Sequence, residues 1–414
     1  MIKSRLAHLG LAMAALGFTA VTPVIGLSTA YAAETVRAEI GGPLQAAQKM
    51  MSSGNAKGAL AELRKLDNVG NKTANESYLI ERVRAAAASS AGDYDTAAKS
   101  FENLINSGKL SAGESAKFSE GLVGIYMRGK EYGKANAAIN KALAKGDSPQ
   151  LRGYLIQNYV SMGNISEAMR LLNSDLRAAE KAGRTPQEDQ LKMLANLQNM
   201  SGDKQNYVGT IEKLAQYYPQ RTYWEDLLNR VVSKPGFSSR LNIDVLRLKL
   251  ANNLLKKPSD YMELAQLVLR DGAAAEAVKI LEKGYKAQIL GVGADAARHQ
   301  RLKDLADKTL ADNTKNLAVN EAALVKAGDN NGLLNLGYAL VQAGQADKGL
   351  KMMEDAIKAD GLRNPEDAKL RLGEAFAAAG KKQQAISTLK TVGGKDGTAE
   401  LARYWIMAIN HPMA

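Results

Sequence analysis

The sequence predicts an all-α protein, an α-solenoid of about ten stacked helical hairpins followed by a C-terminal capping helix. After Thr35, amphipathic stretches of 12 to 16 residues alternate with short turns rich in Gly, Asn, Asp or Pro. Runs of β-branched residues with period-two alternation are missing, so no sheet is expected. The same residue pattern also recurs at spacings of 34 to 39 positions, which is typical of stacked helical repeats.

The first 32 residues have the features of a signal peptide. Lys3 and Arg5 form a short basic start, and an apolar run from Leu9 to Leu27 is interrupted by Pro23. Small residues then occupy the Ala-x-Ala positions that precede a cleavage site, so we predict cleavage after Ala32. The alternative is that the segment is retained as a membrane anchor. A cleaved protein is expected in a bacterial periplasm.

The repeat is defined by a turn glycine in each hairpin. Eight residues before this glycine, six of eight units carry Leu; five residues after it, six carry a small residue; nine residues after it, all eight are apolar. Glycine ends the first helix because it adopts positive φ at little cost, and the small residue lets the second helix cross close to the first. The eight glycines are Gly54, Gly92, Gly163, Gly202, Gly236, Gly272, Gly344 and Gly380.

Two less regular units fill the gaps in this series. Their turns are expected near Lys130 and near Asp307 to Asn313. The ten hairpins then cover roughly residues 36–392 of a repeat domain that we place at residues 33–397. In the remaining segment, 398–414, a helix from Thr398 to Ile409 is expected to cover the apolar face of the last hairpin, as terminal units of stacked arrays require.

Composition excludes several classes of chemistry. The chain has no cysteine and only three histidines, so neither a thiol nucleophile nor a histidine-based zinc site is expected. His299 is interpreted as an exposed helix residue, and His411 lies at the C-terminal end. The formal net charge is +12, but the Lys and Arg residues are scattered along the chain and only 5 % of residues are aromatic. Both observations favour a solvated basic surface over a nucleic-acid site. No catalytic residue, cofactor or metal is predicted.

Two further features have structural interpretations. The stretch from Leu290 to Arg298 contains a GxGxxA pattern, but the preceding residues form a helix of a repeat, so we interpret it as a loop between hairpins. Trp224 and Trp405 are expected in the core, which leaves no tryptophan to stack on a sugar.

The pattern resembles the tetratricopeptide repeat family. The best matches are Leu336 to Ala356, Leu372 to Leu389 and Ala91 to Ile105, which keep the family's Leu-Gly or small residues, turn glycine and large apolar residue. The family's helix A tryptophan is absent, and its closing proline is clear only at Pro219. The resemblance implies a right-handed superhelix whose concave groove binds protein or peptide partners.

The resemblance also implies which residues line that groove. They are polar, with amide and cationic donors and two tyrosines, which suits peptide carbonyls and carboxylates. Lys192, Asn196 and Asn199 resemble the family's clamp for a chain-terminal carboxylate. The full set is Tyr154, Gln157, Lys192, Asn196, Asn199, Gln266, Arg270, Asn335, Tyr338, Gln342, Arg371 and Glu374.

We therefore expect a non-enzymatic periplasmic scaffold or adaptor that acts in cell-envelope assembly, secretion or polysaccharide export. The alternative is a helical-repeat protein that binds or cleaves cell-wall glycans with its basic surface and acidic residues. Neither the partner nor the oligomeric state follows from the sequence, and whether the basic surface binds an anionic polymer stays open.

Overall fold

The computed structural model describes residues 36–144, 146 and 148–413, and over these ranges the chain is helical without any strand. The predicted signal peptide lies outside the described residues. The chain divides into two compact units, the first ending at Ala178 and the second beginning at Ala179. Among the described helices, none is long and apolar enough to span a membrane.

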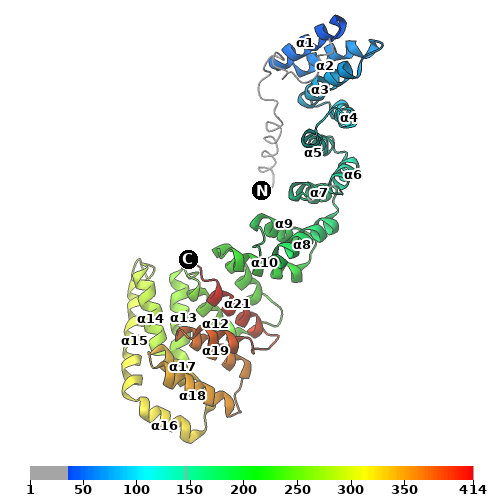
Figure 1. The fold of residues 1–414 in the computed structure, drawn as a ribbon. Coiled ribbons are helices and arrows are strands. Elements are labelled where there is room, and N and C mark those ends of the chain that lie inside the picture. Colours follow the sequence, from blue (N-terminus) through cyan, green and yellow to red (C-terminus); the bar gives the residue numbers. More distant parts are fainter. Residues whose placement is uncertain (1–35, 145, 147, 414) are drawn as a thin grey trace. The chain divides into compact units, whose positions relative to one another are not determined.

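The first unit is a stack of helical hairpins (Figure 1). Its helices begin at recognisable signals: Thr73 and Glu76 form a reciprocal capping box, as do Ser111 and Glu114. The helices are α1 Ala38–Ser52, α2 Ala56–Arg64, the short 3-10 helix η3 Lys65–Asn68, α3 Ala74–Ala91, α4 Tyr94–Asn106, α5 Ala112–Arg128, α6 Tyr132–Leu143, α7 Pro149–Ser161 and α8 Ile165–Lys181, which continues into the second unit.

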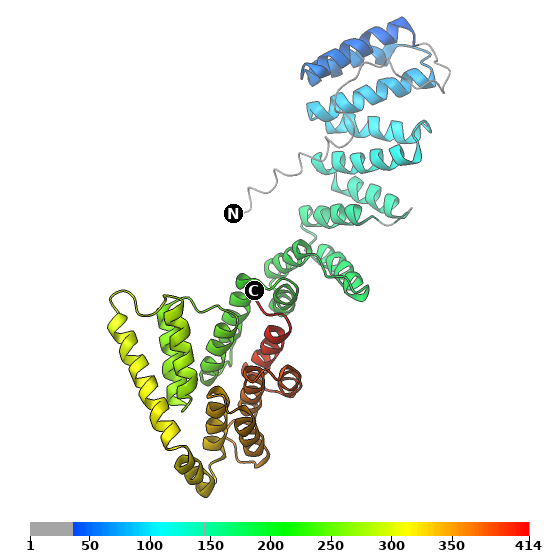
Figure 2. The ribbon, with the colours of Figure 1, turned by 60° about the vertical axis from the view of Figure 1, so that its left-hand side comes forward.

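The second unit contains the remaining helices (Figure 2). Pro258 and Pro365 stand in the first turns of two of them, where a missing backbone N–H costs nothing. The helices are α9 Glu188–Met200, α10 Lys204–Tyr217, α11 Arg221–Val232, η4 Ser239–Leu241, α12 Asn242–Ala251, α13 Pro258–Arg270, α14 Ala274–Lys286, α15 Ala296–Lys315, α16 Leu317–Ala327, α17 Asn330–Gln342, α18 Ala346–Lys358, α19 Pro365–Ala378, α20 Lys382–Leu389 and α21 Thr398–Asn410.

The turn glycines behave as the repeat predicts. All eight have positive φ, between 74° and 87°. The irregular unit at Lys130 uses the same geometry, because Lys130 itself has φ of 59°. The turn therefore has the same backbone shape as the others although lysine stands in place of the glycine. The Cβ of a non-glycine residue strains this conformation.

Two predicted turns are wrong in detail. No turn lies within Asp307 to Asn313, because this stretch contains no helix breaker and continues α15; the chain bends instead at Asn316. Gly236 lies in a longer connection, and α12 packs mainly against α13 and α21 and not against α11. Close packing of the two helices of a hairpin is present in α1–α2, α3–α4, α5–α6, α9–α10, α13–α14, α17–α18 and α19–α20.

The tightest hairpin is α17–α18. Gly337 and Gly349 face each other across the crossing, and a Cβ on Gly349 would lie 2.4 Å from the carbonyl oxygen of Gly337. A Cβ on Gly337 would lie 2.7 Å from the carbonyl oxygen of Gly349. Here the small residues of the repeat allow backbone to touch backbone.

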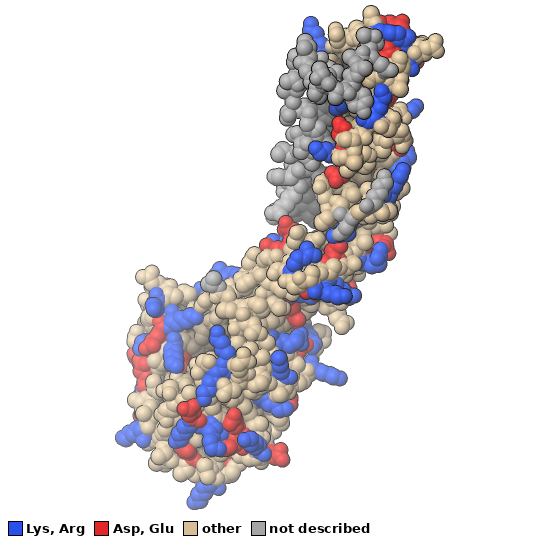
Figure 3. Space-filling model, in the orientation of Figure 1, with Lys and Arg blue, Asp and Glu red and all other residues tan. Residues whose placement is uncertain are grey.

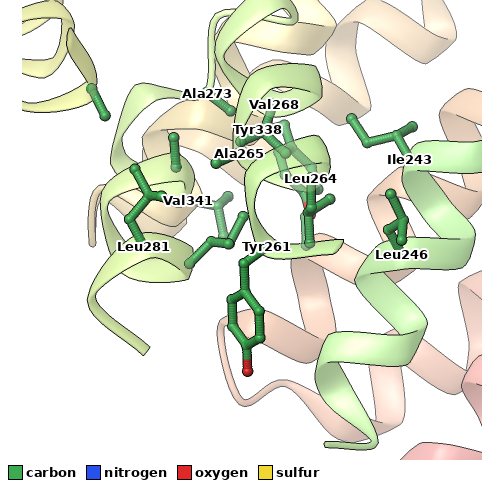
Figure 4. Close-up of a cluster of buried hydrophobic side chains, with 14 of the residues drawn as sticks. Ile243, Leu246, Tyr261, Leu264, Ala265, Val268, Ala273, Leu281, Tyr338 and Val341 are labelled. Carbon is green, nitrogen blue, oxygen red and sulfur yellow. The ribbon is translucent and has the colours of Figure 1, made fainter. Parts of the chain in front are cut away.

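Each unit has its own hydrophobic core. In the first unit a cluster runs from Ile40 to Ala135. In the second, one cluster joins helices from α12 to α20, and Figure 4 shows Leu264 and Val268 of α13 between Ile243 on one side and Val341 on the other. Trp224 and Trp405 are buried as expected, with 0 % and 9 % of their surfaces exposed.

The C-terminal helix closes the second unit. The expected helix is α21, and it packs on α19 and α20 as predicted, but it also packs on α12. The ring of Tyr404 meets that of Trp224 edge-on at 6.5 Å, and Arg403 contacts Glu212 at 2.8 Å. The last helix of the second unit therefore packs against α10, α11 and α12, which stand near the start of that unit. The array of hairpins in the second unit is closed in this sense: its end contacts its beginning.

Candidate functional site

The structure separates the predicted groove residues into four sets. Lys192, Asn196 and Asn199 are exposed on α9. Arg270, Asn335 and Arg371 line one cavity in the second unit. Tyr338 and Glu374 are buried, whereas Tyr154, Gln157, Gln266 and Gln342 lie separately at the surface or partly buried.

The exposed residues of α9 form one continuous helical face, which we call the α9 surface: Lys192, Met193, Asn196, Asn199 and Met200. Met200 is 62 % exposed and Met193 41 %, both unusual for so apolar a side chain. The amide of Asn196 donates to the sulfur of Met200 at 3.6 Å. The surface thus combines adaptable apolar side chains with exposed amide groups.

Glu188 fixes the cationic end of this surface. Its carboxylate contacts the ammonium of Lys192 at 2.8 Å and accepts from the hydroxyl of Tyr223 at 2.6 Å. These hydrogen bonds lower the pKa of Glu188, and the bond from Lys192 has the largest effect. The Glu188 carboxylate in turn raises the pKa of Lys192. The ammonium is therefore held in place and charged.

Inside the second unit lies an ionic cluster centred on Arg247, whose side chain is only 5 % exposed. Its guanidinium donates to both oxygens of Glu276, at 2.9 and 2.8 Å, and to Asp244 at 3.2 Å. It also stacks on the ring of Tyr338, with 4.3 Å from Cζ to the ring centre. We call Arg247, Asp244, Glu276, Glu374 and Arg371 the buried ionic cluster.

Glu374 is the least satisfied member of the cluster. Both of its carboxyl oxygens are buried without a hydrogen bond, and the nearest cation is Arg247 at 3.7 Å. Burial raises the pKa of Glu374, and the neighbouring Asp244 raises it further. Asp244 accepts a hydrogen bond from Arg247, whereas Glu374 accepts none, so the surroundings of Glu374 favour its neutral form more strongly.

The expectation of solvent exposure is wrong for Tyr338 and Glu374, with 6 % and 2 % exposure, and Arg371 is also largely enclosed. The physical reason is the closure of the second unit. In an open array these helix A positions face a groove, but here α19 returns toward α12, so that Arg371 reaches Asp244 at 3.4 Å.

His299 is a further correction. It is 3 % exposed, and its Nδ1 accepts a hydrogen bond from the backbone N–H of Gly291 at 3.2 Å. The interaction ties the loop after α14 to the first turn of α15, so the histidine has a structural role that its polar sequence context did not indicate. The GxGxxA stretch is the loop that was expected.

Arg270, Asn335 and Arg371 line a cavity of about 270 Å³ together with residues that the sequence did not single out, chiefly Arg240, Asn331 and Arg363. Its walls come from η4, α13, α17, α19 and the loop before α19. No repeat offset brings these arginines together; only the closure of the unit does. Within the described ranges, no cluster of acidic, histidine or cysteine side chains could hold a metal ion.

Comparison with known proteins finds one family model that matches two segments of the chain. Residues 83–150 and 334–392 match the family model described as tetratricopeptide repeat. The search of curated proteins gave no significant match.

Three similar solved structures are a tetratricopeptide repeat protein from Parabacteroides merdae, the TPR2AB domain of yeast Sti1 in a complex with pHSP90, and the Cut9–Hcn1 hetero-tetramer of APC/C. The first is 11 % identical, covers 80 % of this chain and 98 % of its own, with a TM-score of 0.30. The second is 14 % identical and covers 72 % and 99 %, with a TM-score of 0.24. The third is 13 % identical and covers 88 % and 66 %, with a TM-score of 0.23. At these scores no inference about function follows from the three structures.

Proposed function

Because residues 83–150 and 334–392 match the tetratricopeptide repeat family model, we propose that the chain is a non-enzymatic scaffold that binds protein or peptide partners, and that the α9 surface is one of its contact sites. Repeats of this family form protein-binding scaffolds. The surface of such an array gives affinity through many modest contacts and not through one deep pocket.

The observation that carries this proposal is the exposure of Met193 and Met200 beside Lys192, Asn196 and Asn199. Methionine is flexible and polarisable, which suits surfaces that adapt to a partner. The amides can pair with backbone groups of a bound segment, and Lys192, held by Glu188, supplies a charge for a carboxylate. Methionines that only filled the core would be buried among apolar residues, whereas Met193 and Met200 are exposed beside polar side chains.

We further propose that the protein is exported to the periplasm and acts in cell-envelope assembly, secretion or polysaccharide export. The support is the basic start, apolar run and Ala-x-Ala end of residues 1–32. Mass spectrometry of protein recovered from the periplasm should find Ala33 as the first residue; an intact N-terminus would contradict cleavage.

The glycan alternative has less support. Saccharide sites usually present aromatic platforms, and both tryptophans of this chain are buried in the second unit. Figure 3 shows Lys and Arg interspersed with Asp and Glu over the visible face of that unit, so this face offers no uniform positive field for an anionic polymer.

The test is site-specific crosslinking in cells. A photoreactive amino acid in place of Met200 should give discrete crosslinked products, which Lys192→Glu with Met193→Gln should reduce. The matched control places the same group at Val319 on α16, which is 71 % exposed. Equal crosslinking from both positions would refute the assignment of the α9 surface.

A further inference from the structure

We propose that the cavity lined by Arg240, Arg270, Arg363 and Arg371 is a binding site for a small ligand that carries one oxyanion group, a phosphate or a carboxylate. The proposal is independent of protein binding at the α9 surface. We call this cavity the arginine cavity. It lies wholly within the second unit, between the start of α12 and the start of α19.

The size of the arginine cavity suits a ligand larger than water. Its volume is about 270 Å³, whereas one water needs only roughly 10–15 Å³ by the same measure. Arg270, Arg363 and Asn364 are exposed, so the cavity is open to solvent on their side. Arg371, from α19, forms its enclosed end with 17 % of the side chain exposed.

The charged donors of the cavity are only partly used by the protein. Arg240 is committed, because it makes two hydrogen bonds to Asp367 at 2.7 and 2.9 Å. Arg371 is held more loosely, because its nearest carboxylate oxygens lie 3.4 Å from Nε, on Asp244, and 3.6 Å from Nη1, on Asp271. Its guanidinium is 17 % exposed as a side chain and lines the cavity, so it keeps donor capacity for a bound oxyanion.

Two other guanidinium groups stand at the open side. Arg270 is 72 % exposed and approaches Asp271 only at 3.7 Å. Arg363 is exposed, and its backbone N–H donates to the side-chain oxygen of Asn331 at 3.1 Å. That bond fixes the amide of Asn331 so that its NH₂ group is left as a donor for a ligand.

Donors therefore exceed acceptors in the arginine cavity. Of its two aspartates, Asp367 is already neutralised by Arg240, and Asp271 is shared between Arg270 and Arg371. Planar guanidinium forks match the oxygens of carboxylate and phosphate and bind them with charge-assisted hydrogen bonds. A cation or a neutral apolar ligand would leave these donors unsatisfied.

The experiment is calorimetric titration of the purified protein with inorganic phosphate and, separately, with glucuronate, in low-chloride buffer. We expect saturable binding of at least one, with one site per chain and a dissociation constant at or below roughly 1 mM. Binding of phosphate alone, glucuronate alone or both identifies which oxyanion the site prefers. No saturable binding of either would overturn the proposal.

Variants locate the site. Arg270→Ala with Arg363→Ala removes two exposed side chains without breaking a short ion pair, so the fold should persist in circular dichroism. The pair should weaken binding by at least about tenfold. The matched control, Arg298→Ala with Arg301→Ala on the exposed face of α15, should leave affinity within about twofold. Equal losses from both pairs, or no loss from the first, would overturn the assignment to this cavity.

Discussion

Arg247 should be the most sensitive position of the second unit. Replacing it with methionine keeps much of its volume but leaves Glu276 buried without its cation and Asp244 with only the longer contact to Arg371. Breaking a buried ion pair by removing one partner costs about 3–5 kcal/mol. Since a domain is stable by about 5–15 kcal/mol, Arg247→Met should remove about a fifth or more of the stability of this unit.

The chain offers a clean assay for this change. It has two tryptophans, Trp224 and Trp405, and both are buried in the second unit. Tryptophan fluorescence during urea unfolding therefore reports on that unit alone. The matched control is Arg298→Met, an exposed arginine at the start of α15 for which we expect a change within about 0.5 kcal/mol.

A second variant separates lost charge pairing from poor packing. Adding Glu276→Leu to Arg247→Met removes one of the stranded carboxylates, so the double variant should recover part of the lost stability. If Arg247→Met alone shifts the free energy of unfolding by less than about 0.5 kcal/mol, the reasoning is refuted and the cluster does not hold the unit together.

Three other predictions use the same unfolding assay or a simple solution measurement. Gly349→Ala should destabilise the second unit by about 1–3 kcal/mol through overpacking. The control Gly209→Ala, which has open space around its Cβ, should stabilise the unit by roughly 0.5–1 kcal/mol. Similar effects of both substitutions would contradict the close crossing of α17 and α18. Burial raises the pKa of Glu374 above its usual 4.5, so its contribution to stability holds at acid pH and is lost as pH rises toward the folded pKa. Glu374→Gln should therefore gain at least about 1 kcal/mol over the parent at neutral pH but not at acid pH. A pH-independent difference would show that folding does not raise the pKa of Glu374. Deleting residues 398–414 should uncover the apolar side of α12 and α19 and cause aggregation in light scattering, and a truncated chain that stays monomeric would exclude a capping role.

The repeat and its turns were predictable because they depend on local chemistry. Each hairpin needs a residue that tolerates positive φ and a small residue at the helix crossing, and both requirements leave marks at fixed offsets, as Gly344 and Gly349 illustrate. The failure at Asp307 to Asn313 has the opposite cause. No residue there interrupts a helix, so the repeat period suggested a turn that the backbone had no reason to make.

The arginine cavity and the buried ionic cluster were not predictable from those offsets. Arg240 and Asp367 are 127 residues apart, and their contact exists only because α19 returns to the start of α12. The position of α19 beside α12 is set by the small rotations between successive hairpins, added over many of them. The residue pattern within one hairpin does not determine these rotations. The sequence did identify Arg371 and Tyr338 as polar helix A residues, but their burial depends on the same return.

The contact between Arg403 and Glu212 has a consequence for how such a protein can change its length. In an open array each hairpin touches only its neighbours, so a duplicated hairpin can be added anywhere. Here α21 must reach α10 and α12 after a set number of hairpins. One extra hairpin between them would carry Arg403 past its partner. We therefore expect a duplicated hairpin to be accommodated in the first unit but to disrupt the second.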